Sequence, residues 1–160
     1  MSNHQCSATN HALHTLYRYV INRPCHTSHS GPTSLVVLVT SNARNVGLRS
    51  AQREAFPSFE LRRRSIKRLF LLARDDRLGN KTAEDRLHQV IQEESNIYED
   101  IIQGDFQEDY KNLTYKHLMG LSWAATYCQG TRWVWSALGL RISFPPRLFF
   151  RGIALFSSCS

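Results

Sequence analysis

The sequence predicts an α/β domain with a mainly parallel sheet flanked by helices, and three observations support this. Two short apolar runs, at residues 35–40 and 68–73, are bounded by turn residues, as strands buried on both faces usually are. Segments with helical spacing of apolar residues alternate with these runs, at 45–56, 81–95 and 113–128. The 42% hydrophobic and 21% charged residues are ordinary for a folded domain that can bury a core without disulfides.

The predicted elements follow in order. Residues 1–16 are polar and His-rich, and we expect a disordered lead-in. A short aromatic run at 17–21 precedes Pro24, and strand 35–40 leads into helix 45–56, which stops at Pro57. Strand 68–73, helix 81–95, a short extended piece at 100–103, helix 113–128 and a strand at 132–135 complete the domain.

We predict that 35–40, 68–73 and 132–135 are neighbouring parallel strands, with helices 45–56 and 113–128 packed against them. Such sheets bind ligands beyond the carboxyl ends of their strands, here residues 40–42 and 73–76. Residues 136–160 hold no acid and no clear period, and we expect them not to continue the sheet.

The charge distribution argues against a nucleic-acid partner. The net charge is +7, but all 13 acids lie between Glu54 and Asp109. Residues 35–135 therefore carry 15 Lys and Arg against 13 acids, an excess of only +2, and the remaining excess lies at the two ends. No apolar stretch approaches the roughly 18 residues of a membrane helix, and the first residues lack a signal pattern, so we expect no anchor or signal peptide in this chain.

Local motifs carry little chemistry. The P-loop, the Rossmann glycine fingerprint, HExxH and GxSxG are all absent. The basic run at 62–64 favours a solvated loop, and the acids Asp105 and Asp109 favour a cap or a solvated turn. Asn80 and Asn112 match the N-glycosylation sequon, and Asn112 also stands where a helix N-cap is expected. The four cysteines leave free thiols and a disulfide both open.

Several segments, taken in order, carry a family resemblance. They are YRYVINRPC at 17–25, LVVLVTS at 35–41, RSAQREAF at 49–56, LFLL at 69–72, EESNIYEDIIQGDF at 93–106 and YKNLTYK at 110–116. Together they resemble the β-1,3-galactosyltransferase and β-1,3-N-acetylglucosaminyltransferase family, glycosyltransferase family 31, and its brainiac-like members in particular. The resemblance covers about residues 17–134.

The resemblance implies the donor-side, N-terminal half of a GT-A-like fold at 17–135, followed by a divergent tail at 136–160. It implies a hexosyltransferase that moves a sugar from a UDP-sugar to a glycan acceptor, with Mn²⁺, in the Golgi. By position it implies UDP-sugar contacts at four residues and, in an oxidising lumen, one disulfide. The contacts would be Arg49, Arg53, Asp105 and Lys116, and the disulfide Cys25–Cys128.

Two departures limit what this chain is expected to do. First, we expect no counterpart of the family's N-terminal anchor helix. Second, the family's acidic DxD element follows the strand at 132–135, where this chain reads WSAL at 135–138, and we expect no counterpart of the downstream acceptor-binding half. The resemblance therefore implies no catalytic residue and no metal ligand here, and we expect this polypeptide alone to be inactive. The alternative is a non-catalytic fragment that binds a nucleotide or another protein. Asp75 and Asp76 form the remaining acidic pair at a strand's carboxyl end.

Overall fold

The computed structural model describes residues 17–25, 33–77, 79–136 and 141–143. The expected lead-in at 1–16 lies outside these residues, as does most of the expected tail. The described residues form a six-stranded sheet in the order β1-β4-β3-β2-β5-β6. Its strands are β1 (Tyr19–Ile21), β2 (Leu35–Thr40), β3 (Ile66–Arg74), β4 (Ile101–Gln107), β5 (Trp133–Ser136) and β6 (Arg141–Ser143).

The predicted parallel core of the sheet is confirmed. β2 pairs in parallel with β3 on one side and with β5 on the other, and β3 pairs in parallel with β4. The two outer strands, β1 and β6, run antiparallel to their neighbours. All carboxyl ends of the parallel strands therefore meet at one edge of the sheet, which is where such folds bind ligands.

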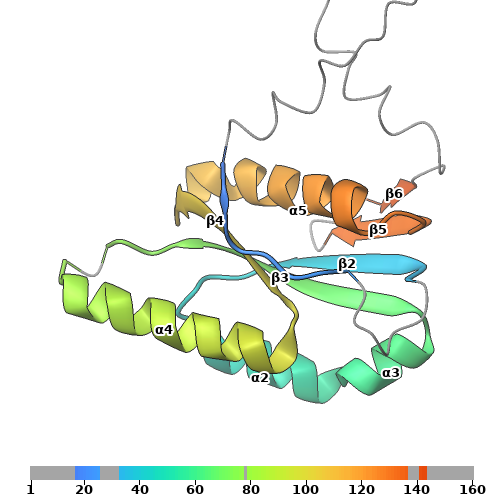
Figure 1. Cartoon of the computed structure of the whole chain (residues 1–160), viewed down its shortest axis with the longest axis horizontal. Coiled ribbons are helices and arrows are strands. Elements are labelled where there is room, and N and C mark those ends of the chain that lie inside the picture. Colours follow the sequence, from blue (N-terminus) through green and yellow to red (C-terminus); the bar gives the residue numbers. More distant parts are fainter. Residues whose placement is uncertain (1–16, 26–32, 78, 137–140, 144–160) are drawn as a thin grey trace, which may run out of the picture.

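Helices cover both faces of the sheet (Figure 1). α5 (Leu113–Tyr127) lies on one face, and the other face carries α2 (Val46–Ala55), α3 (Ser58–Arg63) and α4 (Lys81–Tyr98). The helices predicted at 45–56 and 113–128 are thus confirmed. A 3-10 turn, η1 (Tyr110–Asn112), leads directly into α5.

Alternate residues of the strands feed two separate cores, as the period-two geometry of a strand requires. Val36 and Leu38 of β2 face α5 and join a core that includes Leu71, Met119 and Trp123. On the opposite face, a second core lies beneath α2 and α4. It comprises Ile21, Ala43, Phe70, Leu72, Ile91 and Ile101.

Four features differ from the expectation. The extended piece predicted at 100–103 is a strand, β4, that runs to Gln107. α4 runs to Tyr98 rather than to residue 95, because Glu99 adopts a left-handed conformation (φ 52°) and donates its N–H to the Ser95 carbonyl at 3.0 Å. The basic run is not a loop throughout, since Arg62 and Arg63 close α3. The sheet also continues past residue 136, because β6 pairs with β5.

A disulfide links the segment after β1 to the end of α5. Cys25 and Cys128 are bonded, with their Cα atoms 5.2 Å apart and a sequence separation of 103. Both are buried against the α5-side core. This is the pair that the family resemblance implies.

Candidate functional site

Two adjoining clefts open where β2 and β3 end. One, of about 220 Å³, lies between the end of β2 and the start of α2, and Ser41, Leu48 and Lys116 are among its lining residues. The other, of about 500 Å³, is lined by Asn42, Arg44, Asn45, Asp75, Arg77 and Glu108. Asn42 and Asn45 line both clefts, so the two form one polar surface at the ligand-binding edge of the sheet.

Two arginines on this surface retain solvent access. The Arg44 side chain is 48% exposed and pairs with Asp75 through Nε at 2.6 Å and Nη2 at 2.9 Å. Arg77 is half exposed and pairs with Asp109 at 2.8 Å. Each follows a strand by a few residues, so each carries a positive charge at the cleft. Because Arg44 and Arg77 follow predicted strands, the sequence could have indicated them as residues of the site. The family resemblance did not imply a contact by either one.

Lys116, which the family resemblance implies as a nucleotide contact, lies at this site, but only 3% of it is exposed. Its Nζ donates to the Ser41 carbonyl at 2.9 Å and to both oxygens of Glu108 at 2.6 and 2.7 Å. An ammonium group has three donors, and these contacts use them all.

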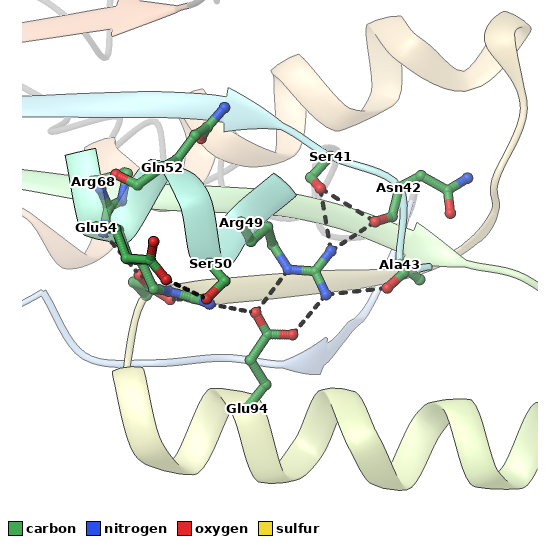
Figure 2. Close-up of polar contacts among 11 residues, drawn as sticks. Ser41, Asn42, Ala43, Arg49, Ser50, Gln52, Glu54, Arg68 and Glu94 are labelled. Carbon is green, nitrogen blue, oxygen red and sulfur yellow. Dashed lines mark hydrogen bonds and ion pairs between the residues drawn. The ribbon is translucent and has the colours of Figure 1, made fainter. Parts of the chain in front are cut away.

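Arg49 lines the smaller cleft, yet its guanidinium faces inward and is 1% exposed (Figure 2). Nε and Nη2 donate to the two oxygens of Glu94 at 2.8 and 2.6 Å. Nη1 reaches Ser41 Oγ and the Asn42 carbonyl, and Nη2 also reaches the Ala43 carbonyl. These five contacts account for all five guanidinium N–H groups.

Arg53 continues this buried charge network away from the cleft. It donates to Glu94 at 2.6 Å and to both oxygens of Asp100 at 2.9 and 2.7 Å, and its guanidinium stacks 4.0 Å over the Tyr98 ring. Arg68 lies 3.5 Å from Asp100 and donates to the Gln52 and Phe56 carbonyls at the end of α2. We call these five residues (Arg49, Arg53, Arg68, Glu94 and Asp100) the buried charge network.

The buried charge network lowers the pKa of Glu94, the carboxylate that Arg49 and Arg53 share. Burial alone would raise the pKa of Glu94, but hydrogen bonds from Arg49 and Arg53 outweigh burial and hold its pKa below the usual range. Glu94 therefore remains ionised near neutral pH and neutralises part of the positive charge of α2.

Asp105, the last of the four nucleotide contacts that the family resemblance implies, lies in β4 and lines neither cleft. It accepts the Arg18 N–H at 2.7 Å and Arg18 Nε at 3.1 Å. Burial acts to raise its pKa, but these Arg18 contacts lower it overall. The structure thus brings Arg49 and Lys116 to the cleft and leaves Arg53 and Asp105 outside it. Nucleotide contact by any of the four stays a prediction.

The two sequons differ in surroundings. Asn80 is exposed and caps α4, accepting the Thr82 N–H at 2.9 Å. Asn112 is partly buried and stands at the N-cap of α5, but its side chain makes no capping bond. Its Nδ2 instead donates to the Gln107 carbonyl at 2.8 Å, while Asp109 caps the preceding 3-10 turn. Asn112 therefore occupies the predicted N-cap position of α5, but its side chain does not make the hydrogen bond of a cap.

Comparison with known proteins assigns the family. The galactosyltransferase family model matches residues 48–136, more than half of the chain. Mouse beta-1,3-galactosyltransferase 2 is 35% identical over 127 residues, which are 79% of this chain and 29% of that protein. Human beta-1,3-galactosyltransferase 1 is 34% identical over 119 residues, 74% of this chain and 34% of that protein. The chain belongs to the galactosyltransferase family, as its segments predicted.

The chain spans about a third of the length of the curated relatives it matches. The residues that the family model matches include the buried charge network and, of the residues that line the larger cleft, Asp75, Arg77 and Glu108. No helix within the described residues is long and apolar enough to cross a membrane.

Proposed function

We propose that residues 17–135 bind the UDP portion of a UDP-sugar, as the donor side of a β-1,3-hexosyltransferase that acts on a glycan acceptor. One observation carries the proposal. This chain belongs to the galactosyltransferase family, and a polar, partly cationic cleft lies at the carboxyl ends of its strands β2 and β3. The larger cleft alone falls in the size range of small-molecule sites. The partners would be the donor nucleotide and the acceptor, with galactose or N-acetylglucosamine as the transferred sugar.

The cations most available to a diphosphate are Arg44 and Arg77. Both side chains are about half exposed and line the larger cleft, whereas Arg49 and Lys116 have their donors occupied by protein groups. Arginine also suits phosphate oxygens by its planar, two-pronged geometry. Binding would draw Arg44 and Arg77 partly away from Asp75 and Asp109.

Mn²⁺, which the family resemblance implies, does not fit the described residues. No group of three His, Cys, Asp or Glu side chains within them could hold a metal ion. Asp75 is paired with Arg44 and Asp76 lies 3.5 Å from Arg74, so the acidic pair at the end of β3 already has cationic partners. A hard divalent cation needs several oxygen ligands in one place, and we derive no step through it.

The location we propose is the oxidising lumen of the Golgi. The Cys25–Cys128 disulfide supports it, because such bonds persist in the secretory pathway and are rare in a reducing cytosol.

A second candidate function is nucleotide binding without turnover. The pairing of the cleft acids favours it, because Asp75 and Glu108 are bonded to Arg44 and Lys116, and catalysis of sugar transfer needs an available carboxylate base near the acceptor hydroxyl. Both candidates share the donor-binding cleft and differ only in chemistry.

Titration calorimetry of the 160-residue chain with UDP, and with ADP as the control nucleotide, tests the cleft. We expect UDP to bind, and we expect Arg44→Met or Arg77→Met to weaken UDP binding by about tenfold to a hundredfold each, since one charge-assisted contact contributes roughly 1.5–3 kcal/mol. Arg63→Met, on the exposed end of α3, is the matched control. Equal affinity in all three variants would refute the proposed site.

A further inference from the structure

We propose that Arg49 is a positioning residue that holds the turn of residues 41–43 in its ligand-binding shape, as the centre of a polar brace running from α4 to α5. The brace is the chain of contacts Glu94–Arg49–Ser41–Lys116–Glu108. It rests on the proposed function only in its consequence for UDP, because the shape of the turn is a property of the free protein.

The first half of the brace lies on the α2 side of the sheet. Glu94 on α4 fixes the plane of the Arg49 guanidinium by bonding Nε and Nη2 at 2.8 and 2.6 Å (Figure 2). The remaining donors then point at the turn. They reach Ser41 Oγ at 3.2 Å and the carbonyls of Asn42 and Ala43 at 2.7 and 3.1 Å.

These bonds set the direction of two consecutive peptide groups. In a trans peptide the carbonyl and the following N–H point to opposite sides, and no peptide bond in the described residues is cis. With the Asn42 and Ala43 carbonyls turned toward Arg49, the N–H groups of Ala43 and Arg44 point away from it. The Arg44 N–H is in turn held by Asn42 Oδ1 at 2.9 Å.

The second half of the brace reaches the same turn from the α5 side. Lys116 donates to the Ser41 carbonyl at 2.9 Å and is itself held by Glu108 at 2.6 and 2.7 Å. Ser41 is thus bonded through its hydroxyl to α2 and through its carbonyl to α5. The turn that borders both clefts has its conformation determined by charged groups from both layers.

Saturation of its donors assigns Arg49 to positioning rather than to ligand contact. A phosphate could bond Arg49 only by displacing Glu94 or the turn carbonyls, which would leave buried polar groups unpaired. Lysine at this position would keep the charge but present one nitrogen, which cannot serve Glu94 and three turn oxygens together.

Amide hydrogen exchange of the full 160-residue chain tests the inference without any ligand. Three amides report the turn, since Ser41 donates to Leu71, Asn45 to Asn42 and Val46 to Arg44, at 3.1, 3.0 and 2.9 Å. In Arg49→Lys we expect these amides to exchange at least tenfold faster relative to the amides of the buried β3 residues. Ser41→Ala removes the hydroxyl, with its contacts to Arg49 and to the Asn42 carbonyl at 3.2 Å each, and should speed the same amides by a smaller factor. Arg63→Met should change neither set.

The outcomes are decisive in each case. If Arg49→Lys speeds the turn and β3 amides by one common factor, Arg49 contributes only to global stability and the inference fails. If Arg49→Lys does not fold, Ser41→Ala decides by the same criterion. A UDP titration of Arg49→Lys tests whether the shape of the turn matters for binding. If the turn amides exchange faster and the UDP affinity is unchanged, the positioning role is overturned. If the wild-type chain binds no UDP, the proposed function fails while the exchange result still decides the brace.

Discussion

Replacing Glu94 with Gln should cost a large part of the domain's stability. The Glu94 carboxylate accepts three hydrogen bonds from two buried guanidinium groups, and it is only 6% exposed. Gln preserves the shape but removes the charge and turns an NH₂ toward cationic donors. Breaking a buried ion pair from one side costs about 3–5 kcal/mol, because the other charge stays buried without compensation. The whole free energy of unfolding of a domain of this size is only about 5–15 kcal/mol.

Urea unfolding followed by circular dichroism measures the loss. Glu93→Gln is the matched control, since Glu93 is the exposed neighbour on the same helix and accepts a hydrogen bond from Gln89 Nε2 at 3.0 Å. We expect the control to change the free energy of unfolding by less than about 0.5 kcal/mol. A loss in Glu94→Gln within 1 kcal/mol of that control would refute the reasoning from burial and shared hydrogen bonds.

The same carboxylate predicts an acid dependence with a definite sign. Because the folded-state pKa of Glu94 is lowered, the unfolded chain binds more protons than the folded one in the pH window between that lowered pKa and the usual Glu pKa of about 4.3. The stabilisation is complete above that pH and is lost as the pH falls through the lowered pKa. We expect the free energy of unfolding to fall less steeply in Glu94→Gln across this window, measured by urea unfolding at a series of pH values.

Three further predictions concern other parts of the chain. Cys25→Ser/Cys128→Ser should lower the free energy of unfolding by up to about 4.7 kcal/mol, the chain-entropy value for a loop of about 100 residues, and urea unfolding that matches the wild type would contradict this. Gly120→Ala should destabilise by about 1–3 kcal/mol, since a Cβ there would meet Leu71 Cδ1 at 2.8 Å, whereas Gly47→Ala, with nothing within 4 Å, should stabilise the exposed helix position. In a secreting cell, mass spectrometry should find glycan on Asn80 rather than Asn112, because Asn112 Nδ2 is bonded to the Gln107 carbonyl, and the reverse pattern would contradict the burial argument.

Continuous apolar runs were sufficient to predict the parallel centre of the sheet. Leu35–Thr40 had only one plausible role, and its neighbours followed from the alternation of strands and helices. α3 was missed because its six residues have no room for a helical apolar stripe. The extension of α4 was missed because it depends on the left-handed conformation of Glu99, a residue type that does not signal such a turn.

The candidate site was predictable in place but not in its partners. The carboxyl ends of β2 and β3 were named from the strand pattern, and the clefts lie there. The sequence motif also drew attention to Arg49 and Arg53, but it carried no sign that Glu94 lies across from both. That pairing joins residues more than 40 positions apart and exists only once α4 packs beside α2. A local motif therefore identified important arginines without distinguishing a ligand contact from a structural ion pair.

The final prediction is that this 160-residue polypeptide transfers no sugar detectably, although UDP binds it. Inverting transfer needs a carboxylate base and charge stabilisation on the departing UDP. Yet the acids that line the larger cleft are already bonded to cations: Asp75 to Arg44 and Glu108 to Lys116. Losing a metal's stabilisation alone costs several kcal/mol of barrier, and each 1.36 kcal/mol is about tenfold in rate. UDP release from UDP-galactose and UDP-N-acetylglucosamine, with Mn²⁺ and a β-linked acceptor, is the measurement. Mn²⁺-dependent turnover that disappears in Asp75→Asn/Asp76→Asn would show that these acids leave their arginines to bind metal, and that the chain is an enzyme by itself.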